Sequence, residues 1–94
     1  MEYQTEIEFE VRSRDGSYLN QLENILSSAN EFHLEALSGS GNRHVALIYI
    51  DGDEVGKCLA IVDSVLRHAV MTATSGSTPK IISWKIKEAR QTVK

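Results

Sequence analysis

The feature that most constrains the fold is an unbroken alternation of side-chain type over residues 3–11. Successive side chains of a β-strand point to opposite faces of a sheet, so this pattern predicts a strand with one buried face and one wet face. A chain that opens in this way requires a sheet that is covered on one side only. The inward set is Tyr3, Thr5, Ile7, Phe9 and Val11, and the outward set is Gln4, Glu6, Glu8 and Glu10.

Five further segments show the periodicity of helices or strands. Apolar residues recur at spacings of three and four over 18–29 and 55–69, which predicts two amphipathic helices. Strands are predicted over 32–38, 44–50 and 81–86, and Gly39-Ser40-Gly41-Asn42 is a hairpin turn signal between the first two of these.

Two stretches carry weaker signals. Residues 71–80 are rich in Thr, Ser and Gly, and we expect a long connection there with a short strand at 70–74. The tail 88–94 is polar. The chain is therefore expected to be one domain over residues 1–94, with an ordered core over about residues 3–87.

The order β-α-β-β-α-β predicts an α+β fold of the ferredoxin-like type. In this βαββαβ arrangement a four-stranded antiparallel sheet carries two helices on one face. The first and last strands are neighbours, so Glu6, Glu8 and Glu10 should lie opposite Lys85 and Lys87. The agreement between two distant charge patterns supports the topology.

Composition excludes several classes of protein. A single cysteine, Cys58, allows no internal disulfide and no multi-cysteine zinc site. The net charge of −3, without a basic stripe, argues against nucleic-acid binding. The longest apolar run, 45–50, is far shorter than the roughly 20 residues needed to cross a bilayer, so we expect no membrane insertion by this chain. No secretory signal is seen, and we expect a cytoplasmic protein.

The run from Val11 to Leu26 resembles the opening of an ACT domain, in which a first strand leads through an Asp-Arg-Pro-Gly-x-Leu-like turn into a helix. Asp15, Gly16 and Leu19 fit that turn, although the proline is missing. Residues 81–86 are similar to the closing strand of the ACT-like cytosolic domain at the C-terminus of MgtC/SapB-type membrane proteins. The resemblance implies a regulatory module that often pairs with a second copy.

ACT domains frequently bind amino acids near the glycine turn, whereas the MgtC-type branch need not bind any. The resemblance therefore implies a small-ligand site at the start of the first helix. A helix N-terminus also favours an anion or a ligand carboxylate, although a plain turn with an N-cap explains the same residues. The expected ligand-binding residues are Asp15, Gly16, Ser17, Tyr18 and Leu19.

Other motifs have structural explanations. No combination of base, nucleophile and oxyanion donors emerges, so we expect no enzyme activity and no cofactor. His33 and His44 could meet on neighbouring strands, but without a carboxylate partner they predict no metal site. Asp51 and Glu54 have the spacing of a helix capping box. Cys58 lies on the apolar stripe of the second helix and is expected in the core.

The segment 44–50 is apolar on both of its faces. A sheet covered by helices on one side needs only one apolar set, so the surplus set should form an apolar strip on the open side. Soluble monomers seldom expose such a strip, and we expect a two-fold homodimer to cover it; the alternative is that the C-terminal tail or the connection 71–80 folds over it. The expected interface residues are Ala46, Ile48, Ile50 and Tyr49.

Two functions remain open from the sequence. The first is a regulatory ACT-like module that binds an amino acid or another small molecule, or transmits a signal, within a larger protein such as a membrane protein. The second is a stand-alone ferredoxin-like adaptor or inhibitor that acts through protein–protein contacts.

Overall fold

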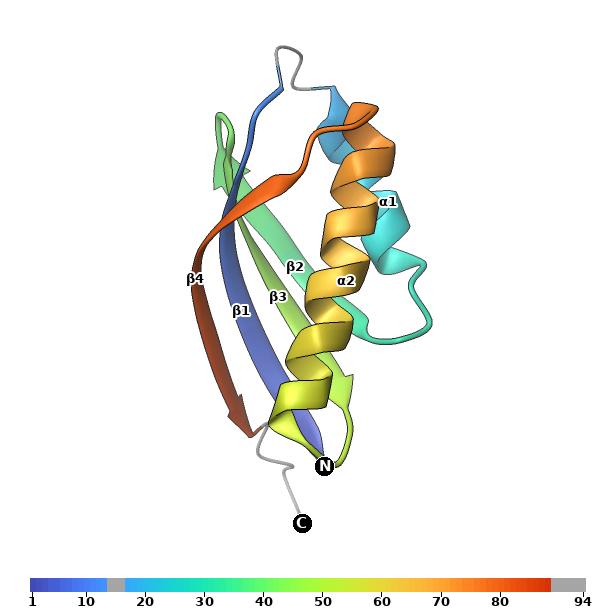
Figure 1. The fold of residues 1–94 in the computed structure, drawn as a ribbon, viewed down its shortest axis with the longest axis vertical. Helices are drawn as coiled ribbons and strands as arrows, with labels where there is room; N and C mark the ends of the chain where they lie inside the picture. Colours follow the sequence, from blue (N-terminus) through green and yellow to red (C-terminus); the bar gives the residue numbers. More distant parts are fainter. Residues whose placement is uncertain (14–16, 89–94) are drawn as a thin grey trace.

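The computed structural model describes residues 1–13 and 17–88, and it confirms the predicted α+β arrangement. Four antiparallel strands form one open sheet in the order β2-β3-β1-β4. Both helices pack on the same side of this curved sheet (Figure 1). The elements are β1 (Glu2–Val11), α1 (Tyr18–Ser27), β2 (His33–Ser40), β3 (Arg43–Asp51), α2 (Val55–Thr74) and β4 (Pro79–Glu88).

Strand β1 lies in the middle of the sheet and pairs with β3 on one side and with β4 on the other. Its inward residues are buried as the alternation predicts. Paired residues in an antiparallel sheet point to the same face. Ala46 of β3 and Trp84 of β4 both pair with Ile7, so they lie on the side of the sheet that the helices cover. The register of β1 therefore decides which side chains of its two neighbours enter the core.

The core fills the space between the sheet and the two helices. Thr5 also lies there, and its buried hydroxyl has no hydrogen-bond partner among the described residues. Two strands and both helices contribute fully buried side chains: Ile7, Phe9 and Val11 from β1, Leu22 and Leu26 from α1, Ala46 and Ile48 from β3, and Val62, Leu66, Ala69 and Val70 from α2.

Helix α2 is longer than the sequence predicted. It continues through Val70 to Thr74, so the expected short strand at 70–74 and the early start of a loop were wrong. The apolar stripe simply runs on: Val70 is fully buried and Ala73 packs against the core. Threonines at the end of a helix resemble loop composition, but here tertiary burial outweighs their low helix propensity.

The connection from α2 to β4 is held by specific contacts. Ser75 takes a left-handed conformation with φ 61° and ends the helix. The Thr74 hydroxyl donates to the Val70 carbonyl at 2.6 Å and accepts from the Ser77 N–H at 3.1 Å. The Ser77 hydroxyl then donates to the carbonyl of Arg12 at 2.9 Å, which ties this connection to the end of β1.

The start of α2 differs from the expected capping box. Glu54 occupies the N-cap position but makes no side-chain capping hydrogen bond. Its carboxylate lies 3.5 Å from Lys57 Nζ. Asp51 is the last residue of β3, and its carboxylate lies 3.0 Å from the amino group of Met1. Asp51 and Glu54 therefore make two separate ion pairs and do not form a capping box.

Both edge strands carry a β-bulge. In β2 the register shifts between Leu34 and Ala36, which leaves Glu35 as the extra residue. In β4 the extra residue is Ile82, because Glu8 pairs with Ser83 and Phe9 with Ile81. Bulges of this kind are common at sheet edges, where they bend the strand and interrupt its pairing.

Neither described helix is both long and apolar enough to cross a membrane.

The β2–β3 hairpin supplies a matched test of the fold. A Cβ added at Gly39, which has φ 143°, would overlap the Arg43 carbonyl oxygen and lie 2.7 Å from the His44 Cα. A Cβ at Gly41, which has φ 61°, meets no atom within 4 Å. We expect Gly39→Ala to lower the free energy of unfolding by more than about 2 kcal/mol and Gly41→Ala by only about 1 kcal/mol.

Urea denaturation of the two variants measures this difference. Equal losses would show that the backbone at Gly39 is not held against β3 as described.

Candidate functional site

The expected ligand turn falls partly outside the described residues. Asp15 and Gly16 lie in that gap, and Ser17 occupies the N-cap position of α1. Leu19 is 37% exposed. Tyr18 points into the core, where it is buried, so its ring does not face a ligand in solvent. The described part of this turn therefore contributes the exposed side chains of Ser17 and Leu19 and one structural tyrosine.

Tyr18 and His44 form a buried polar pair between α1 and β3. The Tyr18 hydroxyl lies 2.6 Å from Nε2 of His44, and the two rings meet edge to face. Phe9 closes the other side, with its ring centroid 5.7 Å from that of His44. Burial lowers the pKa of His44 and raises the pKa of Tyr18, so both groups are neutral at pH 7.

The second nitrogen of His44, Nδ1, is buried and has no hydrogen-bond partner among the described residues. A proton added to this ring would place a positive charge in an apolar core without a compensating carboxylate in contact. The pair therefore joins the start of α1 to β3, and burial makes the neutral form of His44 the favoured one.

Three of the four expected interface residues are not on the open face. Ala46, Ile48 and Ile50 lie in the core, with exposed fractions of 0%, 0% and 2%. The sequence could not decide between the two apolar sets of β3, and the register with Ile7 on β1 decides it. Tyr49 does lie on the open face and is half-buried. The residues of the surplus set are Val45, Leu47 and Tyr49.

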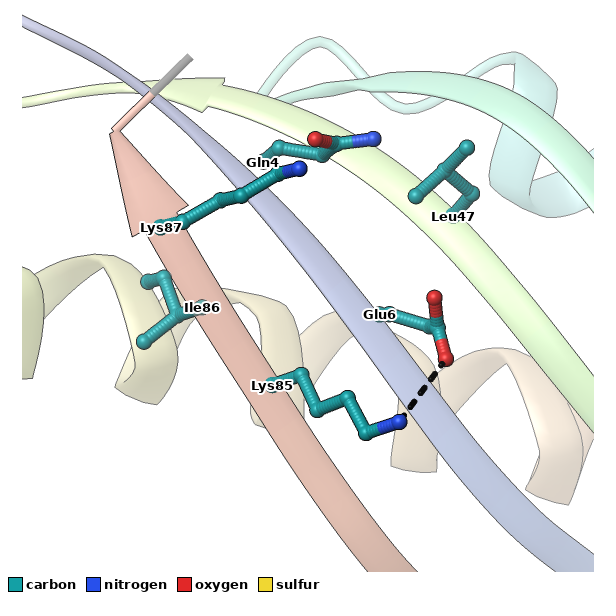
Figure 2. Close-up of a pocket in the computed structure, with 6 residues that line it drawn as sticks. All are labelled: Gln4, Glu6, Leu47, Lys85, Ile86 and Lys87. Atoms are coloured by element: carbon teal, nitrogen blue, oxygen red, sulfur yellow. Dashed lines mark ion pairs between the residues drawn. The ribbon is translucent and has the colours of Figure 1, made fainter.

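These three side chains form what we call the apolar column, which runs along β3 on the side of the sheet away from the helices. The other strands present mainly polar side chains on this open face. The glutamates of β1 lie on one side of the column, and the lysines of β4 lie beyond them (Figure 2). On the other side, β2 presents His33, Ala36, Ser38 and Ser40.

The charge pairing predicted between β1 and β4 is found in part. Glu6 lies opposite Lys85, and Lys85 Nζ is 3.9 Å from Glu6 Oε2 (Figure 2). Glu8 lies opposite Ser83, and its carboxylate is 3.8 Å from Arg43 of β3. The bulge in β4 shifts the register, so the charges do not alternate in simple pairs along both strands.

Lys87 lies opposite Gln4 instead of a glutamate. No ion pair of Lys87 occurs within residues 1–13 and 17–88. A shallow hollow of about 310 Å³ opens at this end of the face, and Figure 2 shows the side chains around it. It is lined by Gln4, Glu6, Leu47, Lys85, Ile86 and Lys87. The sequence did not reveal this hollow, because it depends on the register of three strands.

Two adjoining hollows lie on the helical side, each of roughly 300 Å³. Both include Glu31, Ser64 and Val65, between the end of α1 and the middle of α2. Ile61, which is 40% exposed, lines one of them. They are open grooves between helices, with mainly apolar floors.

The remaining candidate residues do not assemble into a reactive site. His33 lies opposite Tyr49 and His44 opposite Gly39, so the two histidines are separated along the hairpin. The described residues hold no cluster of three or more His, Cys, Asp or Glu suited to a metal ion. Cys58 is buried, as its place on the apolar stripe of α2 predicts.

The buried histidine makes stability depend on pH. The unfolded chain has an ordinary histidine pKa near 6.5, and the folded pKa is lower, so the unfolded state binds the proton more readily. The contribution of His44 to stability is therefore complete above about pH 6.5 and declines as the pH falls below it. We expect His44→Gln, which cannot titrate, to flatten this part of the curve.

Urea midpoints measured between about pH 8 and about pH 5.5 in the two proteins test this expectation, and carboxylates common to both cancel in the difference. Parallel curves would contradict it.

The chain was compared with known protein families, curated proteins and solved structures. No protein family matches the chain, and neither a curated protein nor a solved structure matches it.

Proposed function

We propose that this chain is a non-catalytic protein-interaction module and that the open face of its sheet is the binding surface. The observation that carries the proposal is the apolar column on β3, on the face of the sheet that neither of the two described helices covers. A wet sheet face is normally polar, as β1 is here. Strand β3 departs from this rule, because Val45, Leu47 and Tyr49 occupy three consecutive outward positions. A binding surface explains why apolar side chains are placed there.

The polar groups on the open face suit a protein partner better than an enclosed small molecule. The Lys85 and Glu6 side chains are 75% and 48% exposed, so water already screens their charges. Protein interfaces typically combine an apolar centre with a polar, hydrated rim. The apolar column and the charged rows beside it have that composition.

Site-specific photo-crosslinking in cells tests the proposal. A benzophenone amino acid placed at Leu47 lies on the apolar column, and one placed at Lys57, whose side chain is 77% exposed on α2, is the control. We expect discrete adducts from position 47 and not from position 57, with the contacted peptide identified by mass spectrometry. Equal adducts at both positions, or none at 47, would contradict a binding role for this face.

A second candidate function is the regulatory binding of a free amino acid in the hollow on the open face. Lys87, which has no carboxylate opposite it, favours this function, because it can bind a ligand carboxylate. Glu6 can accept from the ligand ammonium group, and Leu47 offers an apolar contact to its side chain.

Thermal-shift measurements with a panel of free amino acids test this second function. A ligand that raises the melting temperature of the natural chain should have no effect on Lys87→Gln, which keeps the size and polarity of the side chain but removes its charge. If no amino acid shifts the melting temperature, or if the shift survives in Lys87→Gln, the hollow is not an amino-acid site.

A further inference from the structure

We infer that the partner on the open face is a second copy of this chain, packed sheet to sheet about a two-fold axis that runs along the strands over β3. This inference rests on the proposed function, because it names the partner of the same surface. It follows from three properties of that surface: the place of the apolar column, the arrangement of the two signs of charge, and the area available.

The charge pattern favours a copy of the same face. Acidic side chains on β1 and basic side chains on β4 lie side by side, so the face has no single strong sign that would select a strongly acidic or basic partner. β2 contributes mainly small neutral side chains, Ala36, Ser38 and Ser40. A self-complementary surface is what an isologous contact requires.

The direction of the axis follows from which strands of the two copies would face each other. An axis in the interface but across the strands would place each β1 on the partner's β1 and each β4 on the partner's β4. Glutamates would then face glutamates, and lysines would face lysines, which costs free energy. This arrangement is therefore disfavoured.

An axis along the strands, over β3, avoids the glutamate–glutamate and lysine–lysine contacts. It brings Arg43 and Asp51, at the two ends of β3, near their own copies, but both side chains are largely exposed and already paired within the chain, with Glu8 and with the amino group of Met1. It lays the apolar column of one copy on the apolar column of the other, so that Leu47 faces the partner's Leu47. The glutamates of β1 then face the small neutral side chains of the partner's β2, with Glu8 over Ser38 of the partner subunit. The lysines of β4 remain at the rim in water, where charge is least costly.

The area is sufficient for a reversible dimer. Three strands about 4.8 Å apart and about nine residues long cover about 430 Å² of projected surface per copy, or about 850 Å² for the pair. Protruding side chains increase the accessible area to about 1,000 Å², at the low end of specific interfaces. We therefore expect a dimer that dissociates on dilution, with a Kd in about the micromolar range.

Sedimentation velocity over a dilution series of the purified chain tests the dimer. Leu47→Lys should remain monomeric at concentrations where the natural chain is dimeric. Its new ammonium group can pair with Glu6, which lies opposite in the register, so the fold should persist, as circular dichroism would show. The matched control is Ile61→Lys, which makes the same kind of change at an exposed site on α2 and should leave the dimer intact.

Cysteine cross-linking tests the direction of the axis. Packed sheets lie about 10 Å apart, which a short bismaleimide can span. In a Cys58→Ala background, Tyr49→Cys should cross-link to the same position of the second copy if the axis runs along the strands. With the axis across the strands, Tyr49 faces the Arg43 end of the partner's β3, and this homogeneous cross-link should fail.

The outcomes separate this inference from the proposed function. A monomer at every concentration overturns the inference, and so does a dimer that persists in Leu47→Lys or is lost in Ile61→Lys. If position 47 nevertheless cross-links in cells to one different protein, the face is still a binding surface and only the identity of its partner was wrong. Failure of both experiments overturns both statements.

Discussion

The alternation of β1 is the constraint on which the rest of the structure depends. Of the two described strands that have neighbours on both sides, β3 is apolar on both faces, whereas β1 alternates between buried apolar and outward polar side chains and so sets the helical and open faces. Ile7 and Phe9 are fully buried under the helices, and the residues of β3 that pair with them point to the same, helical side of the sheet. A slip of one residue would carry the glutamates into the core, at a cost that no local contact could offset.

Much of the fold could be predicted from the sequence because each element obeys a simple period. The order of elements and the Glu6–Lys85 pairing follow from patterns that need no tertiary information. The end of α2 could not be predicted, because Thr72 and Thr74 resemble loop residues, while the burial of Val70 and the packing of Ala73 that favour a helix there depend on the tertiary fold. The bulges were equally invisible, since one extra residue leaves no signature in composition.

The candidate site was harder to predict than the fold. The sequence showed that β3 has two apolar faces, but the choice between Ile48 and Leu47 as the outward residue depends on which register β1 accepts. The hollow beside Lys87 depends on three strands at once. The contact between His44 and Tyr18 could not be predicted either, because it depends on the placement of α1 over β3.

The bulges at Glu35 and Ile82 have a consequence for how large an assembly this sheet can build. A sheet with two regular edges can recruit further strands at either side, and each added chain offers a fresh edge, so growth has no natural end. Here both margins are interrupted near their middle, and Lys80, Lys85 and Lys87 add like charges along one of them. Both features disfavour the addition of further strands at the edges of the sheet, so contacts through its broad face end with the partner and do not expose a new edge for growth.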